Sequence, residues 1–189
     1  MSTPRIAPLA RPYPTDAAAE LARWMPPDAP VEPIALFRTL ARHLPLAEAM
    51  RPLGSYLLGR RLSIRMRERE LVIHRVCART GCEYEWGVHA GFFGARVGLG
   101  DAELRATVTS DADDPAWSER DALLVRMVDA LHDRGRIADD LWTALAAHWS
   151  EEQLLDLLVL AGWYHVIAYV ANGAGVELEA FGQRFPAPP

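Results

Sequence analysis

The spacing of apolar residues constrains the fold of this 189-residue chain more than any other feature. From Ile34 onward apolar residues recur at intervals of three and four, as in Ile34, Phe37, Leu40 and Ala41. This spacing gathers the apolar side chains on one face of a helix. No stretch shows the sustained alternation of a half-buried strand. The pattern predicts an all-α fold, a helical bundle.

We predict helices near residues 34–43, 46–58, 67–79, 81–97, 101–108, 119–134, 139–148 and 151–171. The clearest boundary signals are two capping boxes or close variants and two helix stops: Ser118 with Asp121, Ser150 with Gln153, Gly135, and the pair Asn172-Gly173. The intervening loops are too short to separate independent domains. A single domain is therefore expected.

Proline marks the two ends of the chain. Eight of the 14 prolines fall between Pro4 and Pro33, and three more lie in the closing FPAPP. We predict a Pro-rich N-terminal arm over residues 1–33, in which only Asp16 to Met25 could form a helix. The helical domain covers residues 34–180, and a C-terminal tail covers residues 181–189.

Charge and composition exclude several functions. A net charge of -5 argues against nucleic acid as a partner, because phosphates are attracted to a basic surface. All 20 positive residues are Arg, so Schiff-base, pyridoxal-phosphate and Walker-type phosphate chemistry have no lysine to use.

Localisation is expected to be cytoplasmic. Two cysteines are too few for a secreted disulfide framework, and prolines interrupt the first residues where a signal peptide needs an apolar run. The longest apolar run, from Leu157 to Ala171, contains His165 and is shorter than the roughly 20 residues of a bilayer span. We expect this segment to be a buried or interface helix, and no membrane partner.

One segment brings several reactive residues together. Cys82, Glu85 and His89 are spaced by three and four, so their side chains share one helix face. Thr80 and Glu83 have capping-box spacing, and a Thr80 cap would set Cys82 at the second helical position, beside unpaired backbone N–H groups. We therefore expect a favoured thiolate at Cys82.

The preceding helix carries a second pair, Glu70 and His74, four residues apart. Antiparallel packing of the two helices could bring Glu70 near Cys82. His74, like His165, lies among apolar residues, so we interpret both as core or pocket-wall residues and leave them out of the catalytic set. Cys77 lies in the apolar string around Val76 and is interpreted as a packing residue.

The order Glu70, Cys82, His89, with GCEYEWGVH in between, resembles the core motif of the carboxymuconolactone decarboxylase family and of the alkylhydroperoxidase-D-like superfamily. The resemblance covers roughly Phe37 to Val108, and the helices through Gly175 look like the extension of longer members. The hydroperoxidase branch carries Glu followed by Cys-x-x-Cys-x-x-x-His, in which Glu and His relay protons to two cysteines. Glu85 stands where the second of these cysteines would be.

The resemblance implies an alkylhydroperoxidase-D-like bundle that assembles as trimers or hexamers, with no cofactor and no metal. The almost entirely apolar helix 151–171 also favours a homo-oligomer, because such a helix needs cover on several faces. Cys77 is not expected to replace the missing cysteine, since it lies on the preceding helix and a bridge needs Cα atoms within about 7 Å.

Three functions remain open at this stage. The leading one is an enzyme that acts on a small organic acid or lactone, with Glu85 or Glu70 as general base, His89 donating or orienting protons, and Cys82 as a polar or nucleophilic partner. The second is a single-cysteine, thiol-dependent hydroperoxide reductase in which Cys82 is oxidised. The third is a non-catalytic helical oligomer that binds a small ligand.

Two alternative interpretations of these residues are considered beside these functions. Glu85 and His89 could form a buried ion pair that only fixes helix packing. The two Glu-x-x-x-His pairs could bind a metal, although helical carboxylate sites use Glu-x-x-His. Arginines at 60, 61, 65, 67, 69, 75 and 79 are interpreted as a solvated, ion-paired face.

Overall fold

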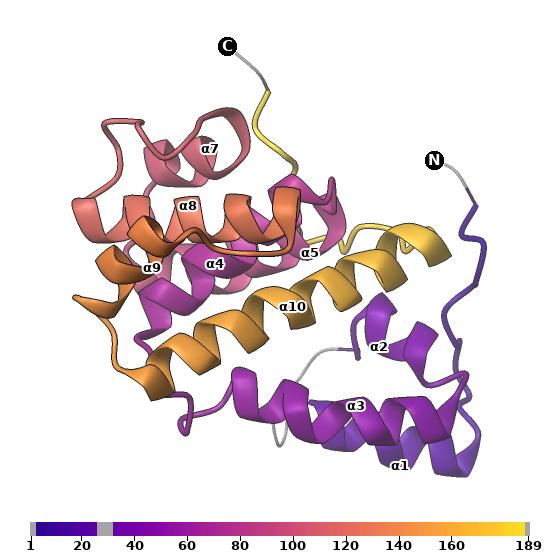
Figure 1. Ribbon diagram of the computed structural model, residues 1–189. Coiled ribbons are helices and arrows are strands. Elements are labelled where there is room, and N and C mark those ends of the chain that lie inside the picture. Colours follow the sequence, from indigo (N-terminus) through magenta and orange to yellow (C-terminus); the bar gives the residue numbers. More distant parts are fainter. Residues whose placement is uncertain (1–2, 26–31, 188–189) are drawn as a thin grey trace.

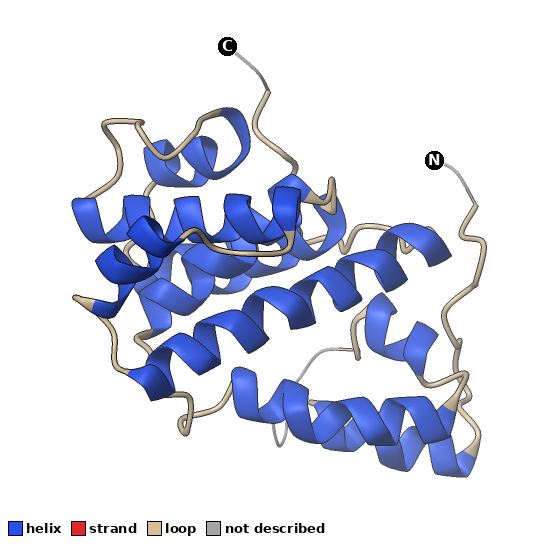
Figure 2. Cartoon of the chain, viewed as in Figure 1, coloured by secondary structure: helices blue, strands red, loops and turns tan. Residues whose placement is uncertain are grey.

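The computed structural model describes residues 3–25 and 32–187, and within these ranges the chain is helical and contains no strand (Figure 2). The helices are α1 Thr15–Trp24, α2 Ala35–Leu40, α3 Leu44–Leu57, α4 Met66–Arg79, α5 Glu83–His89, the π-helix η1 Ala90–Gly94, α6 Ala95–Val97, α7 Asp101–Thr109, α8 Glu119–Arg134, α9 Asp139–Ala146 and α10 Glu151–Ala174. The all-α prediction is confirmed. The parts of the predicted arm and tail at 1–2, 26–31 and 188–189 lie outside the described residues.

Local capping chemistry sets several helix boundaries. The Ser118 and Ser150 side chains accept hydrogen bonds from the backbone N–H groups of Asp121 and Gln153, so both predicted N-termini are confirmed. Gly135 ends α8 with φ 65°, a left-handed conformation that glycine adopts without strain. The stop predicted at Asn172-Gly173 is wrong, because the chain stays helical to Ala174 and first turns left-handed at Gly175.

Helix α4 is the centre of the bundle. It packs against α8, α10, α5 and α7 (Figure 1), and every residue from Glu68 to Cys77 is buried. Leu71, Val72, Ile73 and Val76 are fully covered. A helix buried on all sides cannot present a solvated face, so its polar residues must find partners inside the protein.

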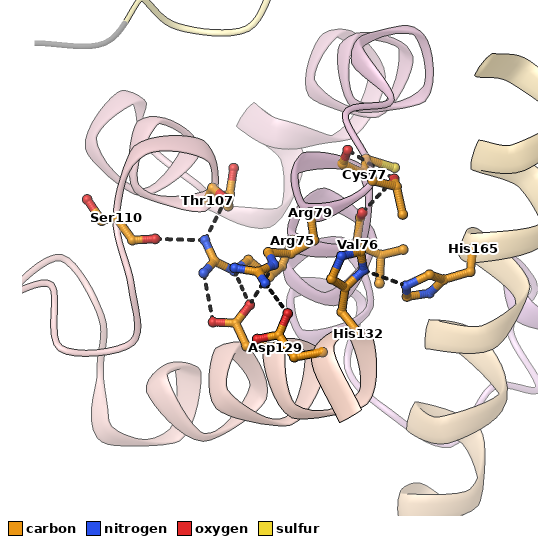
Figure 3. Close-up of polar contacts among 11 residues, drawn as sticks. Arg75, Val76, Cys77, Arg79, Thr107, Ser110, Asp129, His132 and His165 are labelled. Carbon is orange, nitrogen blue, oxygen red and sulfur yellow. Dashed lines mark hydrogen bonds and ion pairs between the residues drawn. The ribbon is translucent and has the colours of Figure 1, made fainter. Parts of the chain in front are cut away.

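The arginine cluster was predicted to be a solvated face, and this is wrong for two of its members. Arg69 and Arg75 are 3% and 4% exposed. Arg75 forms a bidentate ion pair with Asp129 of α8, at 2.8 and 2.7 Å (Figure 3). It also donates hydrogen bonds to the backbone carbonyls of Thr107 and Ser110. It therefore ties α4 to α8 and to the end of α7.

Helix α10 crosses the molecule between the group around α4 and the group of α1, α2 and α3 (Figure 1). Asp156 connects it to the segment after α3, accepting hydrogen bonds from Tyr56 and Ser63. The His132 and His165 rings join α8 to α10, with Nδ1 and Nε2 3.0 Å apart (Figure 3).

Among the described residues, α10 is the one helix whose length and composition would suffice to cross a membrane, and half of its most apolar stretch is buried in the fold. The core helix of a soluble protein has the same properties. Within the predicted arm, α1 packs on α3 and α2.

Candidate active site

A buried ion pair between Glu70 of α4 and His89 of α5 forms the centre of the site. Glu70 Oε2 lies 2.7 Å from His89 Nδ1, and the two side chains are 0% and 4% exposed. Burial alone would lower the pKa of His89, but the carboxylates of Glu70 and Glu85 together outweigh burial and raise this pKa to about 9. The charged His89 in turn holds the pKa of Glu70 below its usual value against the opposing effect of burial. At neutral pH the pair is an imidazolium and a carboxylate.

The second nitrogen of His89 faces two further groups. The Tyr164 hydroxyl of α10 is 3.1 Å from Nε2, and Glu85 Oε1 is 3.5 Å from the same atom. Glu85 Oε2 is buried and has no hydrogen-bond partner in the structure. His89 therefore lies between two carboxylates, and one carboxylate oxygen beside it is unsatisfied.

Cys82 lies at the edge of this group but not where we predicted it. It is the N-cap residue of α5, and Thr80 is instead the C-cap residue of α4, with its hydroxyl donating to the Val76 and Cys77 carbonyls. The predicted Thr80 cap is wrong because Gly81 turns left-handed, with φ 64°, and so belongs to the end of α4. The predicted interaction of Glu83 is also different, since its carboxylate pairs with Arg184 and accepts from Phe185 N–H.

The expected thiolate at Cys82 is not supported. The residue is 0% exposed, and burial raises its pKa to about 12, with the Glu85 carboxylate acting in the same direction. Cys77 is also buried, and burial raises its pKa well above the usual value. Both cysteines are free, and both are thiols at neutral pH.

His74 lies beside the site as a neutral core residue. Its Nδ1–H donates to the Glu70 carbonyl at 2.6 Å, and burial, with the charge of His89, lowers its pKa to about 4. Its ring stands edge-on to His89, with centroids 6.3 Å apart. Nε2 of His74 is buried without a partner.

Two residues of the site were missed by sequence reasoning, Arg69 and Tyr164. Arg69 binds Glu70 Oε1 at 2.7 Å, but it is one of seven arginines between Arg60 and Arg79, and nothing in the sequence distinguished it from the other six. Tyr164 had a detectable signal, because a tyrosine in a nearly all-apolar helix needs a partner for its hydroxyl when it is buried. We expected Glu70 to lie near Cys82, and in the structure the side chain of Glu70 is instead hydrogen-bonded to His89.

The site is closed to solvent, because Glu70, Cys82, Glu85 and His89 are all at most 6% exposed. Immediately after His89 the backbone changes to the π-helix η1, an irregularity that often accompanies functional sites. Phe93 of η1 covers His89, with ring centroids 5.3 Å apart, and lies against the Arg69 guanidinium. A substrate can reach His89 only if these covering groups move.

Within residues 3–25 and 32–187, no three His, Cys, Asp or Glu side chains are arranged to hold a metal ion. A surface hollow lies elsewhere, along α8 and α9, and is lined by residues such as Asp129, Asp133 and Leu141.

Comparison with known proteins supports the same family as the motif. A family model described as the carboxymuconolactone decarboxylase family matches residues 45–125, the segment that contains Glu70, Cys82, Glu85 and His89. This match and the structural neighbours support the resemblance of the chain to the carboxymuconolactone decarboxylase and alkylhydroperoxidase-D-like superfamily. No curated protein matches the sequence.

Solved structures with the alkylhydroperoxidase-D-like fold match nearly the whole chain. An uncharacterised peroxidase-related protein from Ralstonia eutropha JMP134, described as an alkylhydroperoxidase AhpD core, is similar with a TM-score of 0.79 and 16% identity over 100% of both chains. A peroxidase-related protein from Silicibacter sp. TM1040 has a TM-score of 0.78 and 15% identity over 98% of this chain and 100% of that one. The debrominase Bmp8, in complex with 2,3,4-tribromopyrrole, has a TM-score of 0.73 and 14% identity over 96% and 94%. At these identities the likeness establishes the fold alone.

Proposed function

We propose that the protein is an enzyme of the carboxymuconolactone decarboxylase type that performs acid–base chemistry on a small organic acid or lactone. One observation carries the proposal: the ionised His89 lies between the carboxylates of Glu70 and Glu85, at 2.7 and 3.5 Å. A charged imidazole beside an unsatisfied carboxylate is a matched acid and base.

Each residue has a distinct role in this chemistry. Glu85 accepts a proton from a carbon next to a carbonyl group, through the oxygen that has no partner in the closed site. His89 donates its Nε2–H to the oxygen where negative charge develops. Glu70 is a positioning residue that keeps His89 charged and oriented, and Cys82 is an uncharged polar wall of the site.

The second candidate is a single-cysteine, thiol-dependent hydroperoxide reductase. The peroxidase-related names of two structural neighbours favour it, but the debrominase among the neighbours indicates that this fold serves more than one chemistry. The pKa of about 12 at Cys82 argues against it, because the thiolate is the species that attacks peroxide. A non-catalytic ligand-binding oligomer is the third candidate.

A proton-exchange assay tests the leading proposal at its first step, the removal of a proton from carbon, whatever reaction follows. The protein is mixed with a panel of small organic acids and lactones in D₂O, and loss of acidic C–H signals is followed by proton NMR. We expect exchange with at least one compound, a decrease of about 10²–10⁴-fold in Glu85→Gln, and a change of less than about tenfold in Cys82→Ser, since a neutral wall residue is not the base.

A parallel arm measures consumption of an organic hydroperoxide in the presence of dithiothreitol. Hydroperoxide reduction that disappears in Cys82→Ser, with no exchange on any compound, would replace the leading proposal by the second. Absence of both activities, with a folded protein that binds members of the panel, would favour the third.

The remaining expectations are part of this proposal. We expect a small-molecule substrate and a second copy of the chain as the partners, rather than nucleic acid or membrane. We also expect a cytoplasmic location.

A further inference from the structure

The turn between α4 and α5 has a specific hydrogen-bond pattern. Cys82 N–H donates to the Cys77 carbonyl at 2.8 Å, and Gly81 N–H donates to the Ala78 carbonyl at 3.1 Å. With the left-handed Gly81, these two bonds define a Schellman motif. Thr80 reinforces the turn by donating from its hydroxyl to the carbonyls of Val76 and Cys77.

This motif brings the two cysteines together. The 2.8 Å hydrogen bond joins the backbone of Cys77 to that of Cys82, and standard bond lengths then limit their Cα atoms to about 6.7 Å apart. Disulfides span Cα separations of roughly 4.4–6.8 Å. We expected the position of Cys77 on the preceding helix to exclude a bridge, and the Cα separation shows that it does not.

The Schellman geometry also favours contact between the two side chains. In a Schellman motif the two residues joined by the outer hydrogen bond usually pack their side chains together, and here both are cysteines. Both lie in the same buried core, at 0% exposure. Each thiol therefore has the other as a neighbour, in a turn whose geometry the backbone already holds.

We propose that Cys77 and Cys82 are a redox pair that closes an intramolecular disulfide across the turn between α4 and α5. The oxidant is a small-molecule disulfide. One cysteine thiolate attacks it and releases a thiol, and the other cysteine displaces the second thiol from the mixed disulfide. Two hydrogens leave the protein, and the small disulfide gains them as two thiols.

This pair compensates for the cysteine that Glu85 replaces. The second thiol comes from the end of α4 instead of from the next turn of α5. Because both thiols are buried, the dithiol form gains little from thiolate stabilisation, and a pair of this kind favours the disulfide. The inference rests on backbone geometry and does not depend on the proposed acid–base function.

The test refolds the whole chain in buffers with graded ratios of oxidised to reduced dithiothreitol, starting from reduced and from oxidised protein unfolded in guanidinium. Refolding gives the reagents access to thiols that are buried in the native state. Remaining thiols are then blocked with N-ethylmaleimide, and the protein is digested with trypsin without reductant. Trypsin cuts after Arg75, Arg79 and Arg96, which separates residues 76–79 from residues 80–96.

We expect a disulfide to join the two peptides, with the loss of two hydrogens, whether the protein starts reduced or oxidised. On non-reducing electrophoresis the protein should migrate as a monomer, because the disulfide lies within one chain. The matched control exchanges two neighbours, Val76→Cys with Cys77→Val, so that composition is unchanged and the thiol turns about 100° around α4. To form its disulfide, the control should need a ratio of oxidised to reduced dithiothreitol at least tenfold higher than the parent needs.

Three results would overturn the inference. The first is a folded parent protein in which N-ethylmaleimide labels both cysteines at every ratio of oxidised to reduced dithiothreitol, whether refolding starts from the reduced or the oxidised protein. The second is a disulfide that links two chains. The third is a folded control that closes at the same ratio as the parent. Should the control fail to fold, the measurement on the parent protein alone still decides whether Cys77 and Cys82 form a disulfide.

Discussion

At the scale of single residues, the Glu70–His89 pair is the group whose chemistry depends most on pH. The pKa of His89 is raised from 6.5 to about 9, so its stabilising effect is complete below pH 6.5 and is lost as the pH rises through 9. The pKa of Glu70 is lowered from 4.5, so its contribution is present above pH 4.5 and disappears as the pH falls through the folded-state pKa.

This pair leads to a prediction for Glu70→Gln. The parent should lose about 3 kcal/mol of unfolding free energy between about pH 6.5 and pH 10 through the raised pKa of His89, and the variant should lose less, because only Glu85 then supports the charged imidazole. Urea unfolding at a series of pH values measures the difference. Glu20→Gln is the matched control, because Glu20 is also buried but pairs with Arg51 and Arg23, which do not titrate in this range. Equal pH profiles for the two variants would contradict the assignment of His89.

At the scale of elements, the outer face of α5 is covered by the C-terminal segment. Gln183 N–H donates to the Gly87 carbonyl, and Phe185 N–H donates to Glu83. A Cβ atom at Gly87 would lie 2.1 Å from the Gln183 carbonyl oxygen, so only glycine permits this contact. The C-terminal segment thereby holds the helix that carries Glu85 and His89.

We predict that Gly87→Ala displaces this segment. The variant should be less stable by roughly 1–3 kcal/mol, the usual cost of overpacking, and trypsin should cleave it faster after Arg184. Timed digestion followed by mass spectrometry gives the rate. In the control Gly173→Ala the added methyl group meets nothing within 4 Å, and cleavage should keep the parental rate. Unchanged cleavage of Gly87→Ala would mean that the segment is not held by this contact.

At the scale of the whole molecule, α10 leaves apolar side chains exposed. Leu155, Val159, Val166 and Tyr169 are 62%, 44%, 46% and 65% exposed and, with Gly162 between them, follow one face at intervals of three and four. We call these five residues the α10 stripe. The stripe contains no charge, so a second copy of the same helix can face it without burying an unpaired ion.

We therefore predict a homo-oligomer that depends on the α10 stripe. Val166→Lys should dissociate it at micromolar concentration, because a buried lysine without a partner is costly. Ile6→Lys is the control, since Ile6 is 49% exposed and lies outside the stripe. Sedimentation velocity distinguishes the species. A parent that sediments only as a 21.0 kDa monomer would rule the oligomer out.

The sequence by itself determined the helical class, several helix boundaries and the pairing of Glu85 with His89. These features depend on residues a few positions apart: apolar spacing defines a helix face, and Ser118, Ser150 and Gly135 supply their own caps. The error at Thr80 and Gly81 has a local cause as well. Thr80 has the spacing of an N-cap, but the left-handed Gly81 belongs to the end of α4.

Only the tertiary structure decided the chemistry of these residues. The pKa values of His89 and Cys82 depend on burial and on charges from other helices, which no spacing within α5 records. Tyr164 reaches His89 across 75 positions of sequence, because α10 packs against α4 and α5. The sequence pattern assigns Cys77 and Cys82 to two separate helices, and the backbone turn between those helices makes them neighbours.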